Sequence, residues 1–341
     1  MEVEILNSPE PNCDEFVKSR PNATICHTYQ WADAVTRAAR LKAFYFVARD
    51  TNGVHGVLPL TQVKSRLFGN FMVSQAFSNY GGLLADSAEA CDALFNRAVE
   101  MAVELGCESI EFRNIKPLPY ELKPRSGKMC MHLPLASGPE QIWKSFDPKV
   151  RNQVRKAEKS GIVIVTGGTE LLDQFYHVYT VRMRQLGTPC YSLAITEAIL
   201  RQMSDNSRVF VAQLGNLTVG GGFTVCFNGF VEIPWASTLV EYNSLCPNNL
   251  LYWSVIKHYC LAGAKIFDFG RCNADGPTYQ FKKQWDPEPV DLHYQYWVHP
   301  KHKLTVLSPD NPKYKRKVEM WKRLPLWLTR VLGPMISRNL P

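Results

Sequence analysis

The chain has 341 residues, 45% of them hydrophobic and 21% charged, and a net charge of +8. This is the composition of a soluble globular protein long enough for two domains. The N-terminal stretch is acidic and lacks an apolar run, and nowhere do 18 apolar residues follow one another. We therefore expect a cytoplasmic protein with neither an export signal nor a spanning helix. No two of the ten cysteines have the spacing of a zinc site or a redox pair, so no metal is expected.

The positive charge is concentrated in two stretches. Residues 311–341 hold eight Lys or Arg and one Glu, and residues 144–159 hold six Lys or Arg and two acidic residues. Two basic patches on a nearly neutral body suggest partners that carry phosphate, or a membrane surface.

The first third of the chain predicts strands and helices joined by short turns. Thr28 is a typical N-cap residue, and residues 51–53 are typical of a hairpin turn. Pro59 lacks the N–H that a central strand uses, so its strand is expected at an edge or at a bulge. We expect strands at 2–6, 43–49, 54–63 and 109–113, and helices at 28–41 and 87–105.

The remainder predicts a second set of similar elements. Five prolines in residues 115–139 mark a connection and the expected domain boundary. Two tight turns between apolar runs predict an antiparallel meander. The expected helices are 142–160, 169–186, 191–203 and 247–261, and the expected strands are 162–166, 208–214, 217–227, 230–238, 265–269 and 292–298.

One plan of helix, glycine, strand and arginine occurs twice, in residues 102–114 and 259–273. We interpret this as one α+β unit used twice, with mixed sheets rather than a doubly wound one. The predicted domains are residues 1–135 and 136–300, followed by a basic amphipathic tail at 301–341.

The stretch 264–285 combines a buried strand, a turn and a short helix. Arg271 follows the strand and Lys282 lies on the helix, so both cations are expected at one cleft, where they would bind an anion or an oxyanion. A solvated basic turn is the alternative. Arg151, Arg155 and Lys159 share one helix face, which fits either a phosphate contact or a solvated surface.

The second half resembles the FemAB family of peptidyl and aminoacyl transferases, in the subgroup associated with exosortase, PEP-CTERM and exopolysaccharide loci. The matching segments follow the family order over about 140 residues, and several together are a specific signal. They are 149–159, 184–192, 235–237, 247–253, 267–271 and 281–285. The resemblance implies two tandem acyl-CoA N-acyltransferase (GNAT)-like domains with mixed, mostly antiparallel sheets flanked by helices.

The resemblance further implies transfer of an acyl or aminoacyl group to an amine of a cell-envelope precursor, either peptidoglycan or exopolysaccharide. Lys282 inherits a place in the active cleft, and Arg271 is expected to steer an anionic group. Glu232 and Tyr279 are candidate proton carriers, between which the spacing does not select. The expected substrate-binding residues are Arg151, Asn152, Arg155, Lys159, Trp235, Asn249, Asp268, Tyr279 and Phe281, although Asp268 also fits a structural carboxylate paired with Arg271.

The donor is expected to be aminoacyl-tRNA rather than acyl-CoA, and no cofactor is expected to bind tightly. Residues 245–251 lack the Gly-rich loop with which GNAT enzymes hold the CoA pyrophosphate. The alternative function is that of an inactive GNAT-like module binding an envelope glycan or a lipid-linked intermediate.

The tail from 313 to 332 mixes Trp and Leu with Lys and Arg, the composition of a helix lying on an anionic membrane. The alternative is a helix docked on the body of the protein. A helix lying on the membrane would place the protein at the inner face of the membrane.

Overall fold

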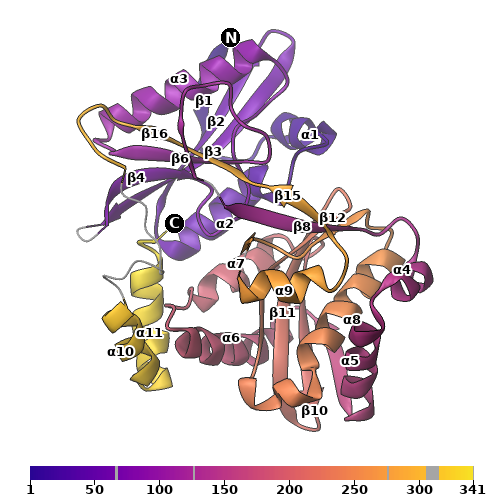
Figure 1. Ribbon diagram of the computed structural model, residues 1–341. Coiled ribbons are helices and arrows are strands. Elements are labelled where there is room, and N and C mark those ends of the chain that lie inside the picture. The colour runs from indigo at the N-terminus through magenta and orange to yellow at the C-terminus, as the bar shows by residue number, and fades with distance from the viewer. Residues whose placement is uncertain (66–67, 126, 275, 305–314, 341) are drawn as a thin grey trace. The chain divides into compact units, whose positions relative to one another are not determined.

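The computed structural model describes all residues except 66–67, 126, 275, 305–314 and 341. The chain divides into two compact units, each built on its own sheet (Figure 1). Unit 1 consists of Met1–Lys128, Asp291–Ser308 and Met335–Pro341, and unit 2 consists of Met129–Val290 and Pro309–Pro334.

Unit 1 contains a mixed sheet in the order β1-β2-β3-β4-β6-β16-β7, with β5 paired to β3. Most neighbours are antiparallel, and β4 and β6 are parallel. Its elements are β1 (Glu2–Leu6), α1 (Pro11–Ser19), η1 (Ile25–His27), α2 (Tyr29–Ala39), β2 (Lys42–Asp50), β3 (Gly53–Ser65), β4 (Gly69–Ser74), β5 (Leu84–Ala85), α3 (Ala88–Glu104), β6 (Ser109–Asn114), β7 (Lys123–Arg125) and β16 (His293–Val298).

Local signals explain several of these boundaries. The hydroxyl of Thr28 accepts a hydrogen bond from the Trp31 N–H and begins α2, as its sequence predicts. Pro59 lies in an interior strand, where an edge or a bulge was expected. It pairs with Tyr45 of β2, while on the other side of β3 the partner β5 begins opposite Val57 and β4 ends opposite Leu60. On that side of β3, Pro59 therefore lies in a gap between two partner strands.

Unit 2 contains a sheet in the order β14-β8-β13-β12-β11-β10-β9, with β15 paired to β8. Strands β12 and β13 are parallel, whereas β9 to β12 pair with one another in antiparallel order and β13 pairs with β8 in the same way. Its elements are β8 (Lys128–Pro134), α4 (Pro139–Ser145), α5 (Pro148–Lys159), β9 (Ile162–Gly167), η2 (Thr169–Leu171), α6 (Leu172–Leu186), α7 (Leu193–Gln202), β10 (Ser207–Leu214), β11 (Leu217–Phe227), β12 (Phe230–Thr238), η3 (Val240–Leu245), α8 (Pro247–Leu261), β13 (Ile266–Asp268), β14 (Cys272–Asn273), α9 (Pro277–Lys283), β15 (Glu288–Asp291), α10 (Lys315–Arg323) and α11 (Leu326–Ser337), of which α11 and β15 reach into unit 1.

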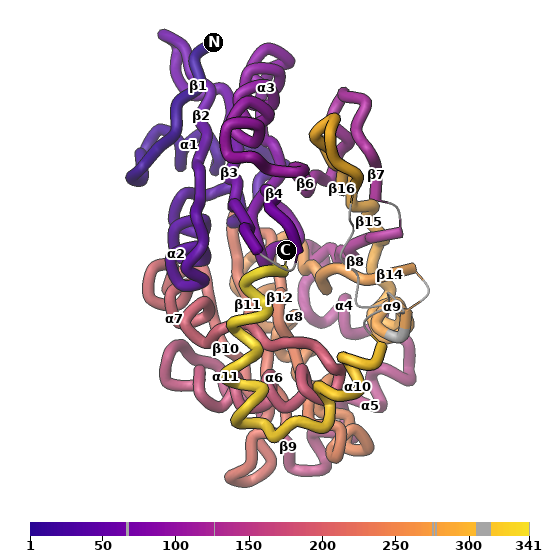
Figure 2. The backbone as a smooth tube through the Cα atoms, turned by 90° about the vertical axis from the view of Figure 1, so that its left-hand side faces the viewer, coloured from indigo at the N-terminus to yellow at the C-terminus, as the bar shows by residue number. Residues whose placement is uncertain are grey.

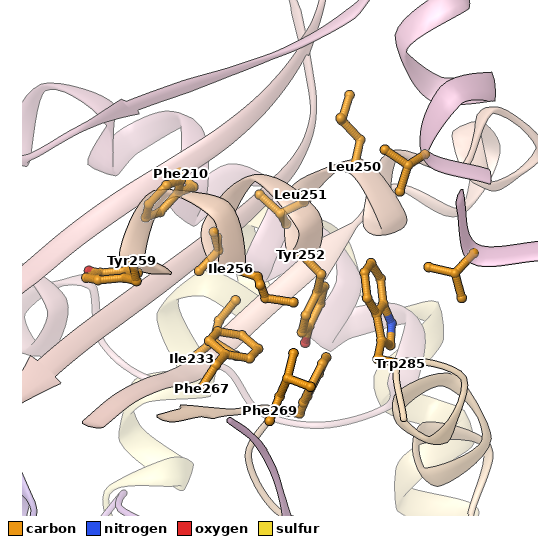
Figure 3. Packing of buried hydrophobic residues seen from close by; sticks show 14 of the residues in the cluster. Phe210, Ile233, Leu250, Leu251, Tyr252, Ile256, Tyr259, Phe267, Phe269 and Trp285 are labelled. Carbon is orange, nitrogen blue, oxygen red and sulfur yellow. The ribbon is translucent and has the colours of Figure 1, made fainter. Parts of the chain in front are cut away.

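The two faces of this sheet carry different helices. Ile233 of β12 belongs to a core cluster with residues of α5 and α8, including Leu251 and Tyr252 (Figure 3). A Cβ at Gly222 would meet Ile233 and Leu251, whereas a Cβ at the preceding residue of β11, Gly221, would meet Phe175 of α6. Because successive strand residues point to opposite faces, α5 and α8 cover one face and α6 covers the other.

The internal repeat predicted from the sequence is present. In unit 1 the helix α3 lies between the parallel strands β4 and β6 along the chain, and in unit 2 the helix α8 lies between the parallel strands β12 and β13. The predicted meander is confirmed as β10, β11 and β12.

Three expectations differ from the structure. The prolines of 115–139 do not mark a simple connection, because residues 128–134 form β8 in the interior of the second sheet. The strand at 293–298 pairs with β6, so it belongs to unit 1 and not to a domain spanning 136–300. The helix expected at 142–160 is two helices, since Asp147 caps a new helix that has Pro148 in its first turn.

The C-terminal helices α10 and α11 lie beside α6 (Figure 2). The Arg184 guanidinium donates to the Leu324 carbonyl, and the Arg330 guanidinium contacts Thr180 Oγ1 and His177 Nδ1 at 3.0 and 2.9 Å. Gly333 approaches Cys190 so closely that a Cβ would lie 2.6 Å from its sulfur. One face of this pair of helices is therefore docked on unit 2.

Candidate active site

Three ionisable side chains form a row across neighbouring strands of unit 2. Glu232 of β12 lies in register with Asp268 of β13, and Asp268 lies in register with His132 of β8. Residues paired across a sheet present their side chains on the same face. The nearest atoms of the His132 ring and the Asp268 carboxylate are 3.9 Å apart. Two acids and an imidazole thus lie side by side on a sheet that is otherwise largely apolar.

Glu232 is the least satisfied member of this row. It is buried, and its Oε1 has no hydrogen-bond partner in the described part of the chain. Burial, and then the nearby Asp268 carboxylate, raise the pKa of Glu232 well above its ordinary value. Asp268 is completely buried and accepts a hydrogen bond from the Gly270 N–H at 2.8 Å. Burial lowers the pKa of His132, although Asp268 acts in the opposite direction.

Lys282 is also buried, and its ammonium is held by the turn that follows β13. Its Nζ donates to the carbonyl oxygens of Gly270 and Arg271 at 2.5 and 3.0 Å. Burial lowers the pKa of Lys282, while surrounding groups, Asp268 among them, oppose this shift. These bonds give Lys282 a structural role in the turn, and its catalytic role stays a prediction.

The aromatic residues around Lys282 explain its position. Trp285 belongs to the same core cluster as Tyr252 and Phe269 (Figure 3). Phe281, which directly precedes Lys282, packs against this cluster. The ring centroids of Tyr252 and Phe281 are 5.2 Å apart, and those of Tyr252 and Phe269 are 5.6 Å apart. Because Phe281 packs in this core, its expected contact with a substrate also stays a prediction.

Trp235 lies on the same strand as Glu232 and closes a small aromatic pocket. It packs against Phe223 and Tyr191, with ring centroids 5.3 and 6.2 Å away. The pocket between β12, α6 and α7 is also lined by Tyr176 and Tyr179. The volume of this apolar recess is about 10 Å³, which is room for no more than about one water molecule.

The basic face of α5 is not close to this row. Asn152, Arg155 and Lys159 lie toward solvent, and Arg151 is half-buried, on a helix that covers the opposite face of the sheet from Glu232. The Arg155 guanidinium lies 5.7 Å from the centroid of the Trp143 ring. The sheet thus separates these basic residues from the acidic row.

The remaining predicted residues have separate environments. The Asn249 amide donates to Gln153 Oε1 at 3.0 Å and joins α8 to α5. Tyr279 lies with its ring centroid 6.0 Å from the Lys283 ammonium. Arg271 is half-buried, directly after the turn that Lys282 holds.

His132 is a member of the row that was not predicted from the sequence. It lies in the proline-containing stretch interpreted as a connection, so its strand was not assigned. The alternation of Met131 and Leu133 with Cys130 and His132 is the signal that would have indicated a strand with one polar position.

Comparisons with known proteins agree with this architecture. A family model described as an acetyltransferase (GNAT) domain matches residues 144–283, which lie within unit 2. Because the parallel pair with its intervening helix is repeated in unit 1, the same plan extends to both units. The chain has a tandem GNAT-like fold.

Solved structures share this tandem fold over most of their length. FemX superposes with a TM-score of 0.69 at 15% identity, covering 93% of this chain and 99% of FemX. The C-terminal domain of a putative lysylphosphatidylglycerol synthetase from Agrobacterium fabrum gives 0.56 at 11% identity, covering 85% and 91%. L-PGS from Bacillus licheniformis gives 0.52 at 11% identity, covering 97% and 98%. No curated protein sequence matches the chain significantly.

Two further findings concern only the described residues. None of their helices combines the length and apolarity needed to cross a bilayer. No group of three His, Cys, Asp or Glu side chains within the described ranges is arranged to hold a metal ion.

Proposed function

We propose that unit 2 catalyses the transfer of an acyl or aminoacyl group to an amine. The observation that carries this proposal is the row of Glu232, Asp268 and His132, with one buried carboxylate oxygen left without a partner among the described residues. A raised pKa brings the Glu232 carboxyl closer to the pKa of an amine, which favours proton transfer between them.

The reaction balances without an added reductant or oxidant. Glu232 accepts a proton from the ammonium form of the acceptor, and the free amine attacks the carbonyl carbon of an ester or thioester. The new C–N bond forms and the bond from carbon to the leaving oxygen or sulfur breaks. Glu232 gives its proton to that leaving atom, and the second proton of the attacking nitrogen is released to solvent. Asp268, which shares the row with Glu232, raises its proton affinity in addition to the effect of burial.

Aminoacyl-tRNA is the donor that we propose, with acyl-CoA as the alternative. The proposed acceptor is an amine of a cell-envelope precursor, of the peptidoglycan or the exopolysaccharide and PEP-CTERM type. The fold shared with FemX and L-PGS supports an envelope substrate. The helix α8 begins at Cys246 and Pro247 without a Gly-rich loop, which disfavours acyl-CoA.

The test measures transfer directly. The full chain is incubated with radiolabelled aminoacyl-tRNA, or in a parallel series with labelled acetyl-CoA, and with nucleotide-linked or lipid-linked envelope precursors. We expect label on the precursor, and a loss of at least about 100-fold in Glu232→Gln, within the usual range for a general base. Glu241→Gln, at an exposed position outside the row, is the matched control and should stay active.

Two outcomes would contradict the proposal. Label transfer that is equal in Glu232→Gln and in the wild type would exclude the acidic row from the chemistry. Precursor binding without any transfer would favour the inactive GNAT-like binding module instead.

We also propose that α10 and α11 bind an anionic membrane surface. These helices expose large apolar side chains, with Met320, Trp327, Val331 and Met335 61%, 67%, 58% and 55% exposed. The last three are four residues apart on α11 and share one side of it. The sequence left two alternatives for this segment, a helix docked on the body of the protein and a helix lying on a membrane. One helix can do both, because its docked side and its exposed apolar side are different.

The charges around this apolar strip favour an anionic lipid surface as its partner. Residues 315–340 carry seven Lys or Arg and only Glu319, whose carboxylate is 2.7 Å from the Lys322 ammonium. Anionic lipid attracts such a segment with about 1 kcal/mol for each basic residue near the surface. An apolar strip flanked by cations matches a lipid surface of negative charge.

Vesicle sedimentation tests this surface. We expect the full chain to sediment with vesicles that contain phosphatidylglycerol and not with vesicles of phosphatidylcholine alone. Trp327→Ser/Val331→Ser should abolish sedimentation, whereas Val163→Ser/Leu217→Ser, at exposed apolar positions elsewhere on unit 2, should not. Equal sedimentation of both variants would overturn the proposal, and a dimer in solution that only the first variant disrupts would assign the strip to a second copy of the chain.

A further inference from the structure

Unit 1 contains a cavity that the proposed transfer reaction does not use. Its volume is about 320 Å³, and all of its lining residues belong to unit 1. It opens where β6 ends at Asn114 and where α3 begins after Ser87. In sheets with parallel strands, the carboxyl ends of the strands and the start of the connecting helix are a common place for ligands.

The segment 79–82 builds one wall of this cavity. Tyr80 lines it, and the Gly82 N–H donates to the Arg113 carbonyl at 3.0 Å. A Cβ at Gly82 would lie 2.2 Å from Asn114 Oδ1, and Gly81 has a φ of +104°. The glycine pair is required here because the backbone packs directly on β6.

His27 presents a hydrogen-bond donor to the cavity. The Thr24 N–H donates to His27 Nδ1 at 3.0 Å, and this bond, shorter than the 3.3 Å contact of Nδ1 with the Thr24 carbonyl, favours Nδ1 as the acceptor nitrogen of the ring. Burial lowers the pKa of His27 to about 4, which keeps the ring neutral at physiological pH. In a neutral ring with an acceptor Nδ1 the proton is on Nε2. His27 lines the cavity, and its Nε2–H makes no hydrogen bond to the described part of the chain.

The charged side chains that line the cavity differ in whether they have an ion-pair partner. The Arg113 guanidinium is tied to the Glu111 carboxylate at 2.8 Å. The Asp86 carboxylate is shared by Arg20 at 3.5 Å and His55 at 3.3 Å. Lys116, which also lines the cavity, forms no ion pair with any described residue. The start of α3 adds N–H donors and the positive end of a helix dipole.

We propose that this cavity binds the phosphate or carboxylate group of a small molecule, with Lys116, the His27 Nε2–H and the first turn of α3 as donors. Leu83, Leu84 and Leu118 give the apolar remainder of the ligand a surface to pack on. This binding site is separate from the transfer chemistry proposed for unit 2, and the proposal does not depend on that chemistry.

Isothermal titration calorimetry with inorganic phosphate and, separately, with acetate distinguishes the two anion classes. We expect saturable binding of one of them to the full chain. Lys116→Glu and His27→Phe should each weaken binding by about tenfold or more, the effect of losing one hydrogen bond to a charged group. Lys123→Glu, at an exposed position of unit 1 outside the cavity, is the matched control.

The absence of saturable binding of either anion would overturn the proposal. So would binding that Lys116→Glu leaves unchanged, or that Lys123→Glu weakens equally. Because Lys116 is exposed, the Lys116→Glu variant should fold even if His27→Phe does not. Neither measurement requires acyl transfer, so a failure here leaves the proposed function intact.

Discussion

Lys282→Met separates a structural from a catalytic role for this lysine. Methionine retains most of the aliphatic stem and removes the ammonium, which donates to the carbonyls of Gly270 and Arg271. Both bonds are lost, and because Lys282 is only 3% exposed, water cannot easily replace them. The structure therefore predicts a stability defect even if the residue has no part in the chemistry.

The size of this defect follows from the two carbonyls. Each buried polar group left without a partner costs about 1–3 kcal/mol. Relief from burying a charge offsets part of this, so we expect the free energy of unfolding to fall by about 2–4 kcal/mol. Urea denaturation followed by circular dichroism measures the change. Lys283→Met is the matched control: it is exposed, and its ammonium lies 6.0 Å from the Tyr279 ring centroid, a contact worth about 0.5–1 kcal/mol.

A Lys282→Met variant as stable as Lys283→Met would refute this reasoning. If such a variant nevertheless lost acyl transfer, Lys282 would be catalytic, as its place in the motif predicts. Loss of stability with transfer retained at low temperature would assign the residue to the turn alone.

Three other perturbations test other parts of the molecule. Gly82→Ala should destabilise unit 1 by about 1–3 kcal/mol, because its Cβ would overlap Asn114 Oδ1, and thermal unfolding would show this. Glu232→Gln should be more stable than the wild type at neutral pH and equal to it well below pH 4.5. Because the pKa of Glu232 is higher in the native than in the unfolded protein, the free energy of unfolding of the wild type falls as the pH rises above the unfolded pKa of about 4.5. The fall is at most about 1.4 kcal/mol per pH unit. Free energies of unfolding of the wild type and the variant that changed in parallel with pH would exclude this. Arg330→Met should free α11 from Thr180 and increase the rate of tryptic cleavage in α10, and an unchanged rate would contradict the docking.

The sequence predicts the parts of the fold that depend on local signals. Thr28 caps α2, and the turns at 215–216 and 228–229 join the strands of the meander. The repeat of helix, glycine, strand and arginine predicts one α+β unit in each half of the chain, and each unit has such a helix and strand. These features need only the residues of one element and its neighbours.

Features that depend on distant partners could not be predicted in this way. The strand 293–298 reads as the end of the second domain, yet it pairs with β6 of unit 1, nearly 200 residues earlier in the chain. His132 and Asp268 become neighbours only when β8 inserts beside β13. The Phe281-Lys282 motif predicts a cleft residue, but not that two carbonyls would occupy the ammonium.

The repeat allows the carboxylates of the two units to be compared. The registers of the parallel pairs place Glu111 of unit 1 at the position of Asp268 in unit 2, and Val73 at the position of Glu232. Glu111 is bound by Arg113 at 2.8 Å and by the Tyr296 hydroxyl at 2.7 Å. Although burial alone would raise the pKa of Glu111, these partners lower it.

A buried carboxylate that is neutralised by a guanidinium and a phenol is fixed in its charged form and is a poor proton carrier. Glu232 has no such partner on Oε1 among the described residues, and its burial together with the Asp268 carboxylate raises its pKa. In unit 2 the position of Glu111 is held by Asp268, whereas Glu232, the proton carrier that we propose, stands where unit 1 has Val73. Arg113 follows Glu111 by two residues, whereas Gly270 holds the corresponding position after Asp268, so the two carboxylates have different neighbours along the chain.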